Sequence, residues 1–446
     1  MLGALLLLAL FGSPVAQEPD QPPNLIFILA DDLGYGDLGC FGQRTISTPA
    51  LDRMAEQGMR LTHFYAGSTV CAPSRCTLMT GMHTGHCRVR GNGRVPLQPD
   101  DLTVAELLQS AGYTTGLIGK WGLGLAETTG IPNSQGFDYF FGYLSQVNAH
   151  NYYPEYLWRN QEKVLLKGNK AQGGVSSLRS QYSHDLFTEE AMTFVRKHHD
   201  EPFFLYLAYT IPHANNERGR KEGNGMEVPD WGPYADREWP EPQKGHAAMI
   251  HRLDRDVGRL LTLLQDLEIA SRTLVIFSSD NGPHKEGGAK PDFFDSNGVH
   301  KGIKRALYDG GIRVPTLAWW PGTVKPGSVC DTPGAFWDFL PTAAEVAGVE
   351  VPEGLDGVSL LPLLRGAELP KRPPLYWEFH ERGFHQALRF GPWKAVRRKA
   401  GPVEIYHLIQ DPGETKNLAE GQPEILQQAQ DLLASSRSPS EHWPGK

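Results

Sequence analysis

The sequence predicts an α/β fold in which helices flank a large mixed, mostly parallel sheet, with a small antiparallel sheet plus a helix at the C-terminal end. Continuous apolar runs of strand length alternate with segments of helical periodicity, and short aromatic strand-like segments follow Pro374. Hydrophobic residues make up 40% and charged residues 21% of the 446-residue chain, as is typical of a globular protein with a buried core.

The first strand and helix have clear signals. Residues 24–30 form a continuous apolar run, which is typical of a strand covered on both faces, and the run stops at Asp31 and Asp32. A helix is expected over residues 49–57, with Thr48 as its cap.

The alternation continues along the chain. A helix over residues 103–110 precedes a strand over residues 114–119 that leads into Lys120. Another strand is expected over residues 203–210, and it ends near His213.

A long helix and a further strand complete the large domain. Apolar side chains recur every three or four positions between residues 249 and 264, which predicts a helix over residues 245–267. The strand over residues 273–279 runs directly into Asp280 and Asn281.

Two other regions differ in character. Residues 214–245 are rich in proline, glycine and charge, so they are expected to form long surface loops. The C-terminal sheet is predicted from strands over residues 375–379, 393–397 and 404–408, with a closing helix over residues 424–435.

Polar residues at strand ends predict a ligand site. The carboxyl ends of parallel strands share one edge of the sheet, where ligands bind. Four residues are expected there: Asp31, Lys120, His213 and Asp280. The Asp31-Asp32 and Asp280-Asn281 pairs together offer three carboxylates and an amide carbonyl, a hard oxygen set suited to Ca²⁺ or Mg²⁺. Either pair alone would rather indicate a solvated turn.

The most specific signal is the segment Cys71-Ala72-Pro73-Ser74-Arg75-Cys76-Thr77-Leu78-Met79-Thr80-Gly81. It resembles the signature of the sulfatase family, Cys-x-Pro-Ser-Arg followed by Leu, Thr and Gly, in which the cysteine is oxidised to formylglycine. The resemblance covers nearly the whole mature chain. In the family's order, it includes residues 24–34, 48–58, 119–121, 278–282, 308–315 and 393–418.

The resemblance implies a site and its cofactors. One calcium ion, in preference to magnesium, would be held by Asp31, Asp32, Asp280, Asn281 and the modified Cys71. The sulfate-binding or proton-transferring residues would be Arg75, Lys120, His213 and Lys304. Lys304 is assigned by its distance from Asp309-Gly310-Gly311, because Lys301 and Arg305 lie close by in the sequence.

The chemistry of a sulfate ester agrees with these implied functions. Its oxygens spread negative charge, so catalysis needs a cationic cradle: the metal, three basic side chains and a helix N-terminus just after Cys71. A hydrated aldehyde offers one hydroxyl to attack sulfur and a second to expel sulfate, whereas a serine ester would stall.

The implied domains are a signal peptide over residues 1–16, a catalytic sulfatase domain over residues 22–366 and a C-terminal α+β subdomain over residues 367–446. The signal is predicted from the apolar run at residues 2–11 and small residues up to Ala16, although no lysine or arginine precedes the run. The protein is therefore expected to be exported, to the periplasm, a lumen or the exterior. No other segment is long and apolar enough to span a membrane.

One position departs from the family pattern. Many sulfatases have Lys-Trp-His-Leu-Gly where this chain has Lys120-Trp121-Gly122-Leu123-Gly124, and that histidine is associated with the second hydroxyl of formylglycine. We hypothesise that His150 compensates, since an imidazole titrates near neutrality. The rival candidates are His83, His86 and His284.

The expected partners are a sulfated small molecule or glycan and a formylglycine-generating enzyme that acts on Cys71. A net charge of −8 argues against nucleic acid. Two alternatives stay open: a phosphodiester or phosphonate ester hydrolase of the same alkaline phosphatase superfamily, and an inactive protein that binds sulfated glycans, as the loss at Gly122 would allow. The five cysteines are an odd number, so at least one is outside any internal disulfide.

Overall fold

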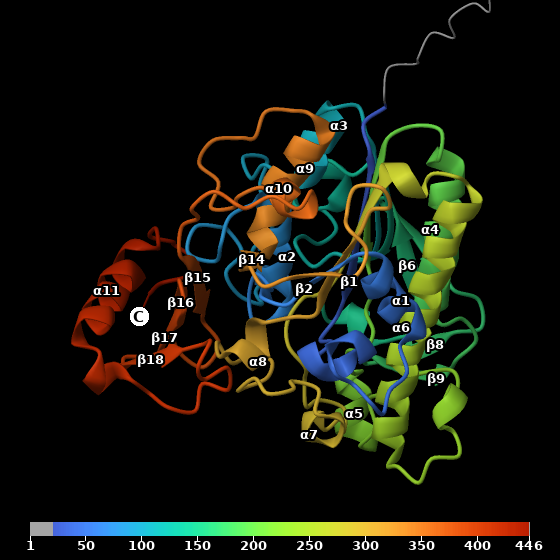
Figure 1. The fold of residues 1–446 in the computed structure, drawn as a ribbon. Helices are drawn as coiled ribbons and strands as arrows, with labels where there is room; N and C mark the ends of the chain where they lie inside the picture. The colour runs from blue at the N-terminus through green and yellow to red at the C-terminus, as the bar shows by residue number, and fades with distance from the viewer. Residues whose placement is uncertain (1–20, 446) are drawn as a thin grey trace, which may run out of the picture.

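A ten-stranded sheet forms the centre of the protein. The computed structural model describes residues 21–445, so the signal peptide predicted over residues 1–16 lies outside the described residues. Helices enclose the sheet, and a smaller C-terminal unit lies beside it (Figure 1). The predicted α/β fold class, with a mostly parallel sheet and a small C-terminal antiparallel sheet plus helix, is confirmed.

Five adjacent strands in the middle of the sheet are parallel. In spatial order they are β11 (Thr273–Ser279), β1 (Asn24–Ala30), β10 (Phe203–Ala208), β4 (Thr114–Lys120) and β5 (Tyr139–Tyr143). The sheet continues beyond β11 with β12 (Thr316–Trp319), β2 (Met59–Leu61) and β13 (Ser328–Cys330), and beyond β5 with β6 (Tyr156–Arg159) and β7 (Glu162–Leu165). The sheet is mixed because β12 and β6 pair antiparallel to their central neighbours.

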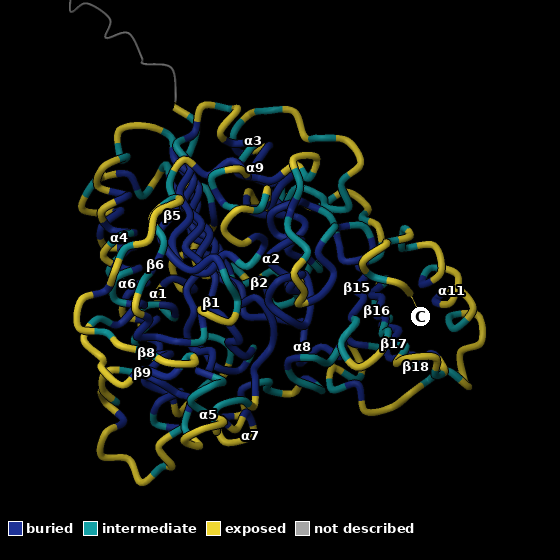
Figure 2. The backbone as a smooth tube through the Cα atoms, turned by 180° about the vertical axis from the view of Figure 1, so that it is seen from behind, coloured by how far each residue is buried: buried dark blue, intermediate teal, exposed yellow. Residues whose placement is uncertain are grey.

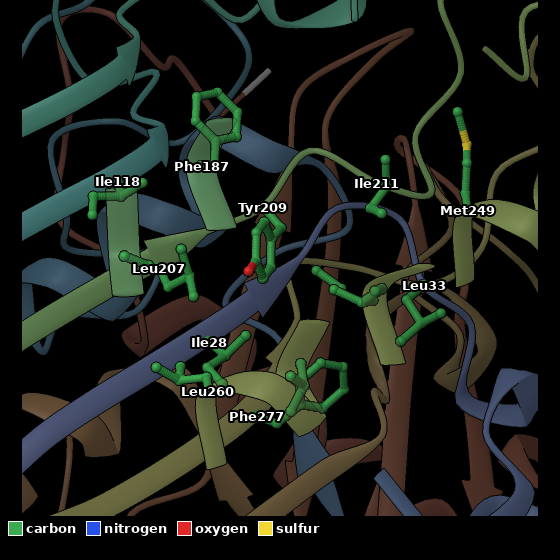
Figure 3. Packing of buried hydrophobic residues seen from close by; sticks show 14 of the residues in the cluster. Ile28, Leu33, Ile118, Phe187, Leu207, Tyr209, Ile211, Met249, Leu260 and Phe277 are labelled. Atoms are coloured by element: carbon green, nitrogen blue, oxygen red, sulfur yellow. The ribbon is translucent and has the colours of Figure 1, made fainter. Parts of the chain in front are cut away.

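Helices cover both faces of this sheet. Ile26 and Ile28 of β1 enter one hydrophobic cluster, whereas Leu25 and Phe27 enter another on the opposite face. The first cluster includes α1 (Pro49–Gln57), α4 (Ser183–His198) and α6 (Glu241–Asp266), and the second includes α2 (Cys71–Thr80), α3 (Val104–Ser110), α9 (Phe339–Ala347) and α10 (Leu361–Leu364). Burial on both faces explains the continuous apolar run of β1. Figure 2 shows the buried centre, and Figure 3 shows side chains of the first cluster in contact.

The C-terminal unit is a four-stranded antiparallel sheet with one helix. Its elements are β15 (Leu375–Phe379), β16 (His385–Phe390), β17 (Trp393–Arg398), β18 (Val403–His407) and α11 (Pro423–Ser435). One face packs Trp377 against Tyr65 and Trp337 of the large domain, and the other packs against α11. The sequence analysis did not identify β16.

The prediction that the Thr48 side chain caps α1 is wrong. The helix has the predicted bounds, but the Thr48 hydroxyl accepts a hydrogen bond from the Gly39 amide and does not cap the helix. The first amides of α1 instead donate to Asp254 of α6, from Ala50 at 3.2 Å and from Leu51 at 2.8 Å. A residue about 200 positions away thus supplies the cap.

The stretch 214–245, expected as loops, contains a helix and the start of another. Asn215 caps α5 (Asn216–Glu222) by accepting a hydrogen bond from the Arg218 amide, and α6 already begins at Glu241. Asparagine is a strong N-cap residue, so the sequence does contain a signal for the start of α5.

The remaining α-helices and strands are short. They are β3 (Phe64–Tyr65), β8 (Lys170–Gln172), β9 (Val175–Leu178), β14 (Gly334–Ala335), α7 (Pro291–Phe294) and α8 (Asp309–Ile312). Within residues 21–445, no helix has the length and apolar character needed to cross a bilayer. All five cysteines are free thiols, and Cys71 is buried.

Candidate active site

The site lies at the carboxyl ends of four adjacent parallel strands. β11, β1, β10 and β4 are neighbours in the sheet, so the polar residues that follow them meet at one edge. This edge carries Asp31, Asp32, Lys120, His213, Asp280 and Asn281. Cys71 and Arg75 lie one turn apart at the start of α2, and positions four residues apart share a helix face.

Asp31 collects three groups of the site. Lys120 Nζ donates to Asp31 Oδ2 at 2.7 Å, and Arg75 Nη2 lies 3.4 Å from the same oxygen. The Cys71 thiol donates to Asp31 Oδ1 at 3.4 Å. Burial would raise the pKa of Asp31, but the charges of Lys120, His213 and Arg75 hold it well below its usual value, so this carboxylate is ionised.

Arg75 ties the helix to two strand ends. Its Nη2 and Nε donate to Asp280 Oδ2 at 2.8 and 3.2 Å, and its Nη1 donates to the Lys120 carbonyl at 2.7 Å. Burial and the charge of Asp31 raise the pKa of Asp280. Every group in this network is buried, so its charges interact in a medium of low dielectric constant.

Asp32 organises the other half of the site. Its backbone has a φ of 66°, a left-handed conformation that aspartate tolerates better than most residues. Lys304 Nζ lies 2.6 Å from Asp32 Oδ2, and His213 Nε2 lies 3.4 Å from the same oxygen.

The sequence left Lys304 in competition with two neighbouring cations, and the geometry separates the three. Lys304 points into the site, whereas Lys301 Nζ donates to Tyr406 and to the Glu414 carbonyl. Arg305 instead pairs with Glu286 and Glu381.

Lys304 and His213 share a hydrogen bond with a defined direction. Their Nζ and Nε2 atoms are 3.1 Å apart, and His213 Nδ1 lies 2.7 Å from the Ala214 carbonyl. Burial and the Lys304 charge lower the pKa of His213 well below its usual value. The neutral imidazole thus donates through Nδ1 and accepts from the lysine at Nε2.

Four residues of the site lie close enough together to hold a metal ion. Ligand atoms of Asp31, Asp32, Cys71 and His213 all lie within 4.8 Å of one another. Asn281 Oδ1 is buried with no hydrogen-bond partner among the described residues, as expected for an oxygen that can bind a cation. Asp280 is outside the compact group, and its two oxygens accept hydrogen bonds from Arg75 and the Asp32 amide.

A side chain from another loop fills the space beside Gly122. This glycine has a φ of 85°, and a Cβ added there would overlap the amide of Gln146. Gln146 Nε2 is buried and has no hydrogen-bond partner among the described residues. His150 lies instead against His213, with stacked rings 4.8 Å apart, and its Nδ1 is 3.0 Å from Glu217 Oε2.

The rival histidines occupy different places. His284 also stacks on His213, with ring centroids 5.7 Å apart, and His284 Nε2 lies 3.1 Å from the Pro212 carbonyl. His83 and His86 stack on each other and contact Asp356.

Sequence reasoning missed Glu286 and the cleft beside it. Glu286 Oε2 lies 3.5 Å from Lys304 Nζ and 3.8 Å from His213 Nε2. Although burial opposes it, the charge of Lys304 lowers the pKa of Glu286 to about 2. A cavity of about 280 Å³ adjoins it, lined by Asn216, Gly219, Arg220, Glu286, Gly287 and Arg305. The only sequence signal for Glu286 was its position six residues after Asp280.

Comparison with known proteins identifies the family. The sequence model of the sulfatase family matches residues 23–349. The chain belongs to the sulfatase family. A second model, N-sulphoglucosamine sulphohydrolase, C-terminal, matches residues 299–437 of this sulfatase. The family identification shows that the protein is a sulfuric ester hydrolase, as the sequence predicted.

Relatives and solved structures agree over most of this sulfatase. It is 32% identical to N-acetylgalactosamine-6-sulfatase of Sus scrofa, over 95% of this chain and 86% of the relative. It is 33% identical to arylsulfatase A of Homo sapiens, over 92% of this chain and 87% of the relative. The crystal structure of Ps i-CgsB in complex with k-i-k-neocarrahexaose has a TM-score of 0.82 and 28% identity, and covers 96% of this chain and 95% of that one.

Proposed function

We propose that this sulfatase hydrolyses the sulfate ester of a sulfated carbohydrate or an aryl sulfate to an alcohol and inorganic sulfate, with formylglycine made from Cys71 and one calcium ion. The observation that supports this most strongly is the position of Cys71. It begins α2, donates to Asp31, and lies next to the cationic groups of Arg75 and Lys120 that bind the same carboxylate. That arrangement suits an anionic group bound at a helix N-terminus.

The cofactors would each supply one kind of chemistry. Calcium, held by Asp31, Asp32, Asp280, Asn281 and the modified Cys71, would supply positive charge that acidifies a hydroxyl and stabilises sulfate oxygens. Hydrated formylglycine would supply a nucleophilic hydroxyl and a second one that releases sulfate. Only hard oxygen ligands would then contact the metal, which favours calcium over zinc.

The remaining residues would bind and orient the sulfate group. Arg75 and Lys120 fix Asp31 and keep it ionised for the metal. Lys304 carries the proton in its hydrogen bond with His213, and the carboxylates of Asp32 and Glu286 raise its pKa, so it would bind the sulfate oxygens as a cation. Glu286 pairs with Lys304 from the cleft side, and Lys304 in turn donates to His213.

The modification itself would precede folding. Cys71 is only 3% exposed, so a formylglycine-generating enzyme could not reach it in the folded protein. The proposal therefore includes conversion of Cys71 in the unfolded chain, together with export through the predicted signal over residues 1–16. It also includes the predicted division into a catalytic domain (22–366) and a C-terminal subdomain (367–446).

A substrate panel tests the proposal. Protein shown by peptide mass analysis to carry formylglycine should hydrolyse sulfated saccharides or aryl sulfates, and phosphodiesters and phosphonates far more slowly. Faster phosphonate or phosphodiester turnover would select the alternative hydrolase. Saccharide binding without any turnover would select the inactive glycan-binding protein, which the intact set of Arg75, Lys120 and Lys304 in the site disfavours.

A further inference from the structure

A second pocket lies between the large domain and the C-terminal sheet and shares no residue with the candidate active site. Its volume is about 790 Å³. Two arginines, Arg313 and Arg389, line it together with the histidines His63 and His300, whose pKa values are lowered by burial and by Arg313, so the arginines supply its positive charge. His300, Arg313 and Arg389 are each no more than 5% exposed, so they form the deep part of the pocket.

Arg389 is a buried cation with an unused donor edge. It is 5% exposed, and its Nη1 donates a hydrogen bond to the Tyr65 hydroxyl at 2.6 Å. Its Nε is buried without a hydrogen-bond partner, and no carboxylate of residues 21–445 forms an ion pair with it. Because Arg389 lines the pocket, an oxyanion bound there would accept a charge-assisted hydrogen bond from its guanidinium.

The buried charges behind the pocket do not balance. Lys394 Nζ lies 2.6 Å from Asp309 and 3.4 Å from Glu414, and Arg313 Nη1 lies 3.4 Å from Asp309. With Arg389, these groups hold three cations against two carboxylates. Burial, which raises the pKa of Glu414 to about 7, increases the positive excess further near neutral pH. Unpaired buried charge is costly, so an anion in the pocket would be stabilising.

The rest of the pocket suits an organic body. Its rim carries the exposed apolar side chains Val299 and Ile409, together with Pro333 and Pro392. Asp331 is also at the rim, but it is exposed and pairs with neither arginine among the described residues. A polar, cationic floor under an apolar rim matches a small molecule that bears one anionic group.

We propose that this pocket is a second binding site, separate from catalysis, for a small organic ligand whose sulfate-like or carboxylate oxyanion is bound by Arg389. Arg313, His63 and His300 complete the floor, and the apolar rim contacts the body of the ligand. The site contributes binding only.

The first test locates an anion directly. Crystals of the native protein are soaked with selenate, which mimics sulfate and scatters anomalously. We expect an anomalous peak within hydrogen-bond distance of the Arg389 guanidinium, besides any peak near Lys304. A peak confined to the catalytic site would overturn the proposal, and this result does not depend on any variant folding.

The second test measures affinity and the identity of the bound group. Benzenesulfonate, which cannot be hydrolysed as an ester, and sodium sulfate are titrated calorimetrically at constant ionic strength into the native protein, Arg389→Gln and Arg398→Gln. The last is a matched control, since Arg398 is exposed and does not line the pocket. We expect the pocket affinity to fall roughly tenfold or more in Arg389→Gln only, as loss of a charged hydrogen bond predicts.

The readouts separate the pocket from the active site. Turnover of an aryl sulfate and its inhibition by sulfate should be unchanged in Arg389→Gln. Tighter binding of benzenesulfonate than of sulfate would identify an organic ligand, whereas equal affinities would contradict the contribution of the apolar rim. Equal affinities of the native protein and Arg389→Gln would overturn the site itself.

Discussion

The amide of Gln146 lies where a side chain at position 122 would begin, so these two residues should be energetically coupled. Gly122→Ala should cost about 1–2 kcal/mol for the left-handed backbone, plus a further penalty for displacing Gln146. In Gly122→Ala/Gln146→Ala the further penalty should disappear, which gives a coupling of about 0.5–3 kcal/mol in urea unfolding. Strictly additive free energies would show that Gln146 moves away at no cost.

Kinetic measurements distinguish whether His150 or Gln146 serves the sulfate-release step. If the His150 imidazole serves the release step, His150→Ala under single-turnover conditions should release alcohol normally and sulfate slowly. The ring of His150 stacks on His213 and its Nδ1 contacts Glu217, so His150 adjoins the site. If Gln146→Ala instead releases sulfate slowly and His150→Ala changes only KM, the release step depends on the Gln146 amide.

Cys71→Ser should abolish repeated turnover. Serine supplies one hydroxyl, so the enzyme should react at most once and then stall. Mass analysis of the peptide that contains residue 71 and steady-state assays check this, with Cys76→Ser as the control, because Cys76 lies on the same helix and is also buried. Sustained activity of Cys71→Ser, or full activity of protein that retains the thiol, would reject the formylglycine proposal.

Asp280→Ala should remove both bound metal and activity. Asp280 accepts hydrogen bonds from Arg75 and the Asp32 amide, so its loss leaves buried Arg75 with Asp31 as its only carboxylate partner among the described residues and removes one of the proposed calcium ligands. Metal analysis of the purified native protein should find one calcium per chain and that of the variant none. Stoichiometric zinc, or full activity after chelation, would contradict a calcium site.

At the scale of elements, α1 depends on Asp254 of α6. Asp254→Ala would leave the amides of Ala50 and Leu51 without an acceptor, so we expect a loss of about 1–2 kcal/mol and faster amide exchange confined to α1. Asp266→Ala is the matched control, since Asp266 lies on the same helix and is exposed. Equal losses in the two variants would show that Asp254 does not act as a cap.

At the scale of the whole molecule, Glu378 joins the C-terminal sheet to the large domain. It lies 3.2 Å from Arg90 Nη1 and 2.9 Å from Arg437 Nε, and its backbone amide donates to Thr84. Burial opposes ionisation, but His380, Arg437 and Arg90 lower the pKa of Glu378 to about 2, below its ordinary 4.5. Its contribution to stability is therefore complete above pH 4.5 and is lost as the pH falls toward 2.

Glu378→Gln should accordingly cost about 3–5 kcal/mol at pH 7, because it leaves buried Arg90 unpaired. Urea unfolding at pH 7, 4 and 2.5 should show this difference shrinking as the pH falls. Glu420→Gln, an exposed site, should change little at any pH. A penalty that is the same at all three pH values would mean that packing, not charge, is responsible.

The sequence alone determined what depends on local pattern. Mostly apolar runs placed β1 and β11 with their observed bounds, because a strand buried on both faces is mostly apolar. The strand-end rule also placed Asp31, Lys120 and Asp280 at one edge, and the segment at Cys71 indicated the family. These signals lie within a few residues of the positions they describe.

The tertiary structure decided every pairing between distant segments. Lys304, and neither Lys301 nor Arg305, lies in the site. Asp254, and not Thr48, accepts from the first amides of α1. Gln146 lies beside Gly122. It also left Arg389 buried without a carboxylate partner among residues 21–445, which is the basis of the proposed second binding site. Such outcomes depend on which side chains share a volume after the chain has folded, and no spacing along the sequence encodes that distance.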